Sequence, residues 1–241
     1  MVTMMRTRSM KRDEQGRWEA LAREDAKFYI KTDLADGEDF FASGERDADG
    51  ILALCDPFLT ARSAALEIGC GVGRLTLPVS RRFGRVVAVD IAPTMLQHLS
   101  ENCAVRGATN VAPMLAGDRW ELHGPIDFAY SRIVLQHIAA WSAIEDYLRR
   151  IAVSLAADGI CYAQFDTRRH TPLYHLKNAL PDIVLPRTWR RGVRRIRRSM
   201  ESIRAAATQA GLAVALERGA GTYDTELILR KAGASAVSPA R

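Results

Sequence analysis

The sequence predicts an α/β fold: a Rossmann-like, seven-stranded and mostly parallel sheet with an antiparallel last strand and helices on both faces. Three observations predict it. From residue 63 onward, short apolar segments alternate with segments of helical length, a pattern typical of parallel strands joined by crossover helices. A glycine-rich loop, residues 69–73, follows the first apolar segment. Two apolar segments near the C-terminus are separated only by residues 218–224, which favours a hairpin and an antiparallel last strand.

Size and composition fit one globular domain. The chain has 241 residues, 48% of them hydrophobic, but no apolar run approaches the ~18 residues that a membrane-spanning helix needs. The first 16 residues are charged and lack the apolar core of a secretory signal. The four cysteines are scattered and form no C-x-x-C pair, which disfavours a zinc site or a disulfide framework. We therefore expect a cytoplasmic protein.

The expected elements follow from hydrophobic periodicity. We expect flexible tails over residues 1–16 and 232–241, and one domain over 17–231. Two N-terminal helices are expected, over residues 18–30 and about 47–59. The strands that follow are expected at 64–68, 85–89, 111–116, 126–130 and 159–165, with helices between them at 74–83, 93–106 and 141–156. A helix at 199–210 and strands at 212–217 and 225–229 close the domain.

Polar features follow four of the predicted strands. The glycine loop follows the first strand and leads into a helix, which leaves room for a ligand to approach the backbone. Asp90 ends the second strand, where a carboxylate can accept hydrogen bonds from both hydroxyls of a ribose. Asp118, after the third strand, can accept a hydrogen bond from an exocyclic amine such as that of adenine. Ser131 ends the fourth strand. Since parallel strands end at the same edge, these features predict a nucleotide-type pocket.

In these segments the sequence resembles the class I S-adenosylmethionine-dependent methyltransferases. The segments E-I-G-C-G-V-G, V-V-A-V-D, A-G-D and F-A-Y-S-R-I-V-L-Q-H-I match that family's motifs in order and spacing. The resemblance implies the seven-stranded fold, S-adenosylmethionine as cofactor and an N-terminal helical lid over residues 17–60. It also implies the residues around the cofactor: Tyr29, Glu67, Gly69, Cys70, Gly71, Arg74, Asp90, Ile91, Met95, Gly117, Asp118, Arg119 and Ser131.

The same residues allow two other interpretations: a nicotinamide-binding loop, or separate structural roles for each residue. A nicotinamide-binding loop places a small residue where this chain has Arg74, and the terminal hairpin also disfavours a dehydrogenase. Taken alone, Asp90 could cap the helix that begins at Pro93, Asp118 could be a turn residue and Cys70 a small space-filling residue. The four features in register favour the methyltransferase.

The resemblance implies that the reaction is a methyl transfer. Methyl transfer from a sulfonium requires alignment with the acceptor and exclusion of water. The segment after the fourth strand reads Ser131-Arg132-Ile133-Val134, without the N/D-P-P-Y of enzymes that methylate amide or base nitrogens, without a Pro-Cys pair and without a carboxylate for a metal. We therefore predict no catalytic metal. His137 is the candidate general base; the alternative is that it packs against or caps the next helix.

Residues 166–198 are predicted to be a basic insertion that caps the substrate. Residues 187–198 hold seven arginines and no acid, so the net charge of +6 becomes −1 without them. The apolar residues Leu185, Trp189, Val193, Ile196 and Met200 recur at helical spacing, which predicts an amphipathic helix. Three interpretations stay open: a lid with solvated arginines, a site for an anionic acceptor, or contact of residues 185–200 with an anionic membrane. The candidate acceptor contacts are His170, Tyr174, His175 and Arg194.

These observations lead to one functional hypothesis with alternatives. The hypothesis is a metal-independent methyltransferase that acts on a small molecule, at oxygen rather than nitrogen, with an anionic or lipid-linked acceptor as one interpretation. The first alternative is an RNA or protein methyltransferase that docks through the arginine-rich segment, although nucleic acid is disfavoured because the basic charge is confined to that segment. The second is a non-catalytic subunit that binds the cofactor.

Overall fold

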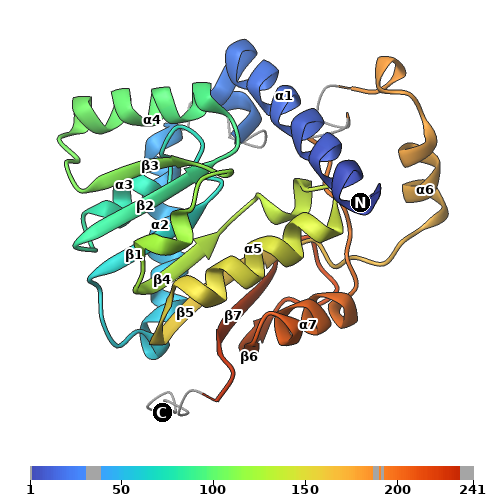
Figure 1. Cartoon of the computed structure of the whole chain (residues 1–241). Helices are drawn as coiled ribbons and strands as arrows, with labels where there is room; N and C mark the ends of the chain where they lie inside the picture. Colours follow the sequence, from blue (N-terminus) through green and yellow to red (C-terminus); the bar gives the residue numbers. More distant parts are fainter. Residues whose placement is uncertain (1, 31–38, 187–189, 191–192, 234–241) are drawn as a thin grey trace.

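A seven-stranded mixed sheet forms the centre of the computed structural model, which describes residues 2–30, 39–186, 190 and 193–233, and side chains from residue 13 onward (Figure 1). The strand order is β3-β2-β1-β4-β5-β7-β6. Six strands are parallel and β7 is antiparallel to its neighbours, as the hairpin predicts. The strands are β1 Ala64–Ile68, β2 Arg85–Asp90, β3 Val111–Leu115, β4 Ile126–Ser131, β5 Leu155–Phe165, β6 Leu212–Arg218 and β7 Thr225–Lys231.

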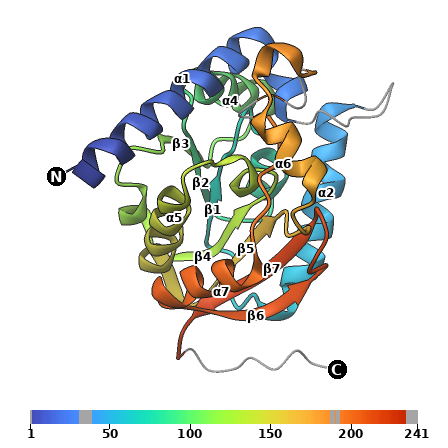
Figure 2. The same cartoon turned by 90° about the vertical axis from the view of Figure 1, so that its right-hand side faces the viewer.

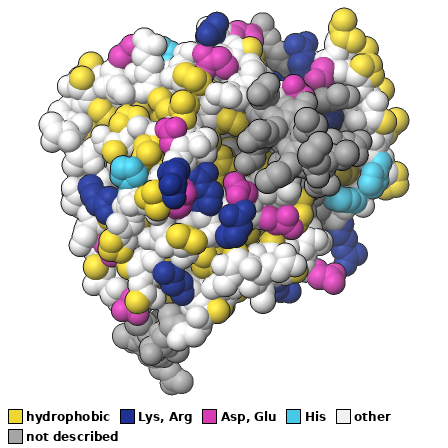
Figure 3. All heavy atoms as spheres, in the orientation of Figure 1, with side chains coloured by type: hydrophobic (Ala, Val, Ile, Leu, Met, Phe, Trp, Pro, Cys, Tyr) yellow, Lys and Arg dark blue, Asp and Glu magenta, His cyan; other side chains and the backbone are white. Residues whose placement is uncertain are grey.

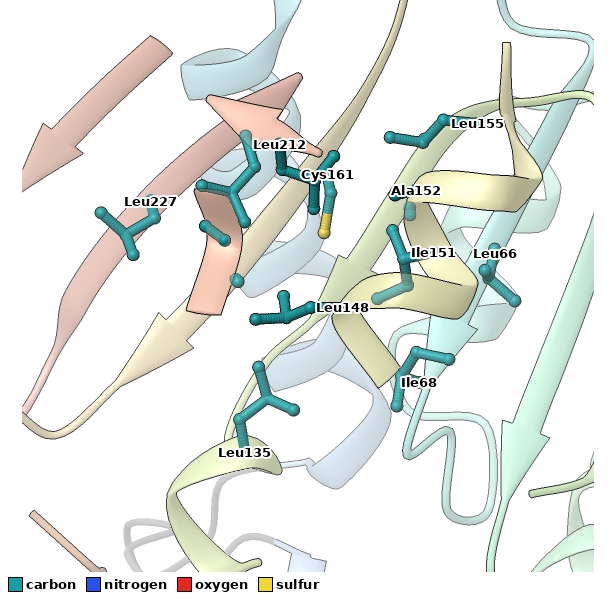
Figure 4. Packing of buried hydrophobic residues seen from close by; sticks show 14 of the residues in the cluster. Leu66, Ile68, Leu135, Leu148, Ile151, Ala152, Leu155, Cys161, Leu212 and Leu227 are labelled. Atoms are coloured by element: carbon teal, nitrogen blue, oxygen red, sulfur yellow. The ribbon is translucent and has the colours of Figure 1, made fainter. Parts of the chain in front are cut away.

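Helices cover both faces of this sheet. They are α1 Val2–Ile30, α2 Phe40–Cys55, α3 Thr76–Ser80, α4 Pro93–Arg106, α5 Trp141–Ser154, α6 Pro172–Ala179 and α7 Met200–Gln209. The short 3-10 helices are η1 Asp56–Phe58, η2 Trp120–His123, η3 Leu135–His137 and η4 Asp182–Val184. On one face α5 and α7 pack on β1, β4, β5 and β7, and Figure 4 shows Ile151 of α5 close to Leu66 and Ile68 of β1, with Leu148 on the side of Leu135. On the other face α2 and α3 cover the sheet.

The predicted strands and helices of the alternating part are confirmed, with small shifts at their ends. The bounds of β1 and α4 agree with the prediction. Helix α3 begins at Thr76, two residues late, because the glycine loop continues as turns up to Leu75. Helix α2 begins early, at Phe40, because the Asp39 carboxylate accepts a hydrogen bond from the Ala42 N–H at 2.7 Å and caps it.

The N-terminal segment differs from the prediction of a tail. Helix α1 begins at Val2, so residues 2–16 are helical and continuous with the expected helix over 18–30. The helix bends at Asp25, whose backbone is extended (φ −163°) and whose carboxylate accepts a hydrogen bond from the Phe28 N–H at 3.1 Å. Asp25 therefore caps a short second helical segment. Most of the predicted C-terminal tail, residues 234–241, lies outside the described residues.

The arginine-rich segment does not form the predicted helix over its described part. Residues 187–189 and 191–192 lie outside the described residues, and residues 193–199 are irregular. The backbone there bonds to distant segments, with the Ile196 N–H donating to the Gln136 carbonyl at 2.6 Å and the Arg198 N–H to the Asp166 carbonyl at 2.8 Å. These long-range bonds replace the hydrogen bonds of a helix, so the helix that the apolar periodicity predicts is absent from residues 193–199. The insertion instead contributes α6 and η4.

Candidate functional site

A cavity of about 460 Å³ lies at the carboxyl ends of the central strands. Its wall is formed by the ends of β1, β2, β3 and β4, by the glycine loop, and by side chains of α1, α4 and α5. Its volume is in the range of small-molecule sites in proteins. The position agrees with the rule that ligands of open α/β sheets bind beyond the carboxyl ends of the strands.

The glycine loop holds its shape through backbone bonds and close contacts. The N–H groups of Gly69 and Cys70 donate to the Val89 carbonyl at 2.7 and 3.0 Å, which ties the loop to β2. Gly69 has a φ of +78°, and a Cβ atom there would lie 2.3 Å from Cγ2 of Val134. Only glycine fits at this position, because both its backbone conformation and the space around it exclude a side chain.

Asp90 connects the end of β2 to this loop. Its Oδ2 accepts a hydrogen bond from the Gly71 N–H at 2.8 Å, and its Oδ1 accepts one from the Ala92 N–H at 2.9 Å. Burial raises the pKa of the Asp90 carboxyl, although these bonds oppose the rise. Asp90 lines the cavity and does not serve merely as a helix cap, because one oxygen bonds to the glycine loop.

Glu67 is a buried carboxyl group in the same wall. It accepts hydrogen bonds from the Thr76 hydroxyl at 2.5 Å and the Tyr130 hydroxyl at 2.8 Å. Burial raises its pKa to about 7, and the two hydroxyl bonds oppose that rise. A cationic ligand in the cavity would favour the ionised form of Glu67.

Two arginines line the cavity and share one acid. Nη1 of Arg74 lies 2.7 Å from Oδ2 of Asp47 on α2, and Nε of Arg132 lies 3.8 Å from the same oxygen. Nη1 of Arg132 donates to the Tyr162 hydroxyl at 2.8 Å, and Asp224 and Glu226 lie within 3.5 Å. Among the described residues, the Nε atoms of both arginines are buried without a hydrogen-bond partner. Both side chains line the cavity, so their positive charge suits anionic groups of ligands, whereas the two buried Nε atoms are not exposed to it.

Ile133, next to Arg132, has a strained backbone. Its φ is +58°, the left-handed region that β-branched residues rarely adopt. Its N–H donates to Oε1 of Gln164 at 2.7 Å, which helps to hold this conformation. Ile133 lines the cavity, so the strain lies where the end of β4 meets the ligand space.

Helix α1 crosses over the cavity, and Figures 1 and 2 show it running past α4. The Glu19 carboxylate accepts bonds from the hydroxyl and the N–H of Thr94 on α4, at 2.5 and 3.1 Å. Glu14 accepts one from the Ala139 N–H, just before α5, at 2.7 Å. Trp18 lies between these two contacts in the helix and lines the cavity. Both ends of this stretch of α1 are therefore fixed to the domain.

The structure brings most of the predicted cofactor residues into one wall. Those that line the cavity are Tyr29, Glu67, Gly69, Cys70, Gly71, Arg74, Asp90, Ile91, Met95, Gly117 and Asp118. Arg119 and Ser131 do not line it; the Ser131 hydroxyl is buried and donates to the Ile68 carbonyl at 3.1 Å. The sequence prediction missed Glu14, Trp18, Arg132, Tyr147 and Arg150, which also line it.

His137 does not line the cavity. Its ring packs edge-to-face on Trp18 at 6.2 Å between centroids, and its Nδ1 lies 3.3 Å from the Arg194 carbonyl. Burial and the charge of Arg195 lower the pKa of His137 to about 4, so the imidazole is neutral at physiological pH and a weak base. This arrangement favours the packing interpretation, and the role of general base stays a prediction.

The four predicted acceptor residues lie outside the cavity wall, and three of them, His170, Tyr174 and His175, lie together. His170 stacks on Tyr174 at 4.9 Å between centroids, and His175 lies 5.4 Å from His170. The Tyr174 hydroxyl accepts a hydrogen bond from the Arg197 N–H at 3.2 Å, while the Arg194 carbonyl contacts His137. These residues anchor α6 to the arginine-rich segment; their contact with an acceptor stays a prediction.

Comparison with known proteins agrees with this geometry. Residues 65–159 match a family model described as a methyltransferase domain. The solved structure of magnesium protoporphyrin IX methyltransferase from Synechocystis with S-adenosylmethionine bound is similar, with a TM-score of 0.60, 16% identity and coverage of 91% of this chain and 97% of that one. An S-adenosylmethionine-dependent methyltransferase from Clostridium acetobutylicum is similar with a TM-score of 0.59 and 15% identity, over 82% of this chain and 94% of that one. The CcbJ methyltransferase from Streptomyces caelestis is similar with a TM-score of 0.58 and 18% identity, over 82% of this chain and 98% of that one.

A curated relative matches only a short segment. The tRNA/tmRNA (uracil-C(5))-methyltransferase of Teredinibacter turnerae is 35% identical over 68 residues, which are 25% of this chain. The chain therefore spans about a fifth, 19%, of that protein's length.

The fold and the cavity define a class I Rossmann-like protein that binds a nucleoside cofactor. Residues 65–159 match a methyltransferase domain, and the fold around them is that of S-adenosylmethionine-dependent methyltransferases of known structure.

The residues present fit that cofactor. The glycine loop leaves space where a Cβ atom would intrude, Asp90 supplies acceptors suited to ribose hydroxyls, and the positive charge of Arg74 in the wall suits the methionine carboxylate. When bound, the cofactor supplies an activated methyl group. The protein then has to orient the acceptor and exclude water, for which α1 and Trp18 are placed.

The described residues form neither a metal site nor a membrane span. In the described part of the chain, no three His, Cys, Asp or Glu residues gather as metal ligands, and independence of metal stays a prediction. None of the described helices is long and apolar enough to cross a membrane.

We predict that Glu67 makes the ligand-free protein less stable as pH rises. Because the folded pKa of about 7 exceeds the usual 4.5, the folded state binds more protons between these values. The free energy of unfolding should fall between pH 4.5 and 7, by about 3 kcal/mol from this group. Urea unfolding across this range checks it: Glu67→Gln should flatten the slope, while Glu101→Gln on exposed α4 should not. Equal slopes in wild type and Glu67→Gln would contradict the assignment.

Proposed function

We propose that the domain methylates an anionic oxygen, a carboxylate or an acidic hydroxyl, of a small molecule, and that Arg132 binds that oxygen. The observation that carries the proposal is the positively charged side chain of Arg132 in the cavity wall, directly after β4. Burial opposes this charge, but Tyr162, Asp224 and Asp47 raise the pKa of Arg132, so it stays protonated.

The position of Arg132 supports an acceptor role and not a cofactor role. Arg74 lies in the glycine loop and suits the methionine carboxylate, whereas Arg132 follows β4. Asp47 lies near both guanidinium groups. The cofactor site at Arg74 and the acceptor site at Arg132 would therefore lie next to each other. A charge-assisted bond to Arg132 would orient the acceptor oxygen toward the methyl group.

Oxygen is supported over nitrogen by the same charge. A guanidinium attracts an oxyanion and disfavours the ammonium form in which an aliphatic amine exists at neutral pH. An oxyanion also needs no general base for methyl transfer, which agrees with the position of His137 outside the cavity wall. The proposed chemistry forms an O–CH₃ bond as the S–CH₃ bond breaks, and the oxyanion becomes a neutral ester or ether.

A small acceptor is supported by the cover over the cavity. Helix α1 is fixed on both sides of it through Glu14 and Glu19, and Trp18 fills part of the wall. A large folded acceptor would have to displace this helix, whereas a small molecule or a single extended group would not.

The test uses methyl-labelled S-adenosylmethionine with a bacterial cell extract. The extract is separated after reaction into small molecules, protein and nucleic acid, and the labelled product is treated with mild alkali. We expect label in the small-molecule fraction, either released as methanol from an ester or retained as an ether. Label in RNA or protein, or an N-methyl product, would contradict the proposal. RNA has a specific reason to be included, because the curated relative with the short match acts on tRNA.

A further inference from the structure

Large apolar side chains are exposed on one segment of the basic insertion. Ten such side chains are exposed in the described part of the chain. Five of them lie in one stretch, residues 173–184, which includes most of α6 and all of η4. We name these five the α6 apolar patch: Leu173, Leu176, Leu180, Ile183 and Val184, with exposed fractions from 37% to 87%. Figure 3 shows hydrophobic side chains along the right-hand rim, where α6 lies in Figure 1. Exposed apolar groups gathered in this way mark an interaction surface.

The opposite side of α6 is anchored to the protein. The Tyr174 hydroxyl accepts a hydrogen bond from the Arg197 N–H, and the Arg197 guanidinium lies 4.4 Å from the centre of the Tyr174 ring. The His170 ring lies within 3.3 Å of the Arg197 carbonyl. Because these contacts fix the helix by its aromatic side, the leucines at positions 173, 176 and 180 face outward and cannot turn inward without breaking them.

The charge around the patch identifies its partner. Residues 166–198 carry ten Arg and Lys residues and two Asp residues, a net charge of +8, so the rest of the chain has a net charge of −2. One of the two acids, Asp166, is buried and paired with Arg168 at 2.5 Å. Arg169 and Arg190 are exposed. Apolar side chains that project from a cationic segment match an anionic lipid surface. The apolar side chains enter the interface, and the cationic side chains bind the lipid phosphates.

We propose that the α6 apolar patch, together with Arg169 and Arg190, forms a docking surface for an anionic lipid bilayer. The leucines and Ile183 enter the boundary between headgroups and acyl chains, and Arg169 and Arg190 contact lipid phosphates. The attachment is peripheral and depends on salt. It would hold the molecule by the insertion next to the cavity, independently of whether methyl transfer takes place.

The test is sedimentation of the full chain with vesicles of phosphatidylcholine alone or with 30 mol % phosphatidylglycerol. We expect binding to the anionic vesicles that falls at least tenfold when NaCl rises from 50 to 300 mM. The double variant Leu176→Asp/Ile183→Asp should weaken binding at least tenfold, and so should Arg169→Glu/Arg190→Glu. The matched control Leu122→Asp/Val153→Asp changes exposed apolar residues elsewhere and should bind like wild type.

Three results would overturn the proposal. The first is a wild type that binds neither vesicle at low salt, and the second is binding of both patch variants like wild type. The third is a dimer in sedimentation velocity that only the patch variants dissociate, which would assign the patch to a second copy of the chain. Binding of S-adenosylhomocysteine and the melting temperature report whether each variant is folded. Because vesicle binding is measured without methyl transfer, its failure is distinct from a failure of the proposed function.

Discussion

Gly69→Ala is expected to weaken binding of S-adenosylmethionine by at least about 100-fold. The residue has a φ of +78°, which alone costs an alanine roughly 1–2 kcal/mol. The added Cβ would also lie 2.3 and 2.6 Å from the two γ-carbons of Val134, below any real contact distance. The loop or the end of β4 has to move, and both line the cavity. Isothermal titration calorimetry with S-adenosylhomocysteine measures the loss.

Gly107→Ala is the matched control for this substitution. Gly107 ends α4 with a φ of +68°, so an alanine there has a similar conformational cost, but no atom lies within 4 Å of the added Cβ. We expect a modest loss of stability and unchanged affinity for the cofactor. If both variants bind the cofactor like wild type, the close approach of the glycine loop to Val134 is not part of the site.

Arg132→Lys is expected to lower methyl transfer to the acceptor by on the order of 10- to 100-fold, with the affinity for the cofactor within threefold of wild type. Lysine keeps the positive charge among Asp47, Asp224 and Glu226, so the carboxylates stay compensated. It lacks the planar guanidinium fork that we assign to the acceptor oxygen. Loss of one charge-assisted hydrogen bond, about 1.5–3 kcal/mol, gives this range.

The measurement is transfer of labelled methyl to the small-molecule fraction of an extract, beside calorimetry with S-adenosylhomocysteine. Arg168→Lys is the control, because Arg168 is also paired with a buried acid, Asp166, but does not line the cavity. It should transfer at nearly the wild-type rate. A wild-type rate for Arg132→Lys, or an equal loss of cofactor binding, would contradict the acceptor role.

The cofactor half of the site could be predicted from the sequence because its signals are local. Strand β1, the glycine loop and α4 each depend on residues within the element itself: an apolar run, three glycines and Pro93. Asp90 follows its strand directly, and parallel strands bring such positions to one edge. The antiparallel β7 follows from the short loop before it.

The acceptor half could not be predicted because it depends on contacts between distant segments. Trp18 reaches the cavity only because Glu14 and Glu19 fix α1 to segments more than 70 residues away. Arg132 was visible in the sequence as a charged residue after a buried strand, but its acidic partners come from α2 and from the hairpin. The apolar spacing of 185–200 predicts a helix, whereas the backbone of residues 193–199 bonds to Asp166, just after β5, and to Gln136 of η3.

Calorimetric titration of the purified chain with S-adenosylmethionine, S-adenosylhomocysteine and NAD tests the central claim most directly. The glycine loop with Arg74, Asp90 and Asp118 predicts one site that binds both sulfur compounds with dissociation constants in the micromolar range, competitively, and does not bind NAD. Asp90→Ala should abolish that binding. Binding of NAD at this site, or affinity for S-adenosylmethionine that Asp90→Ala leaves unchanged, would contradict the assignment of the cavity to the methyl donor.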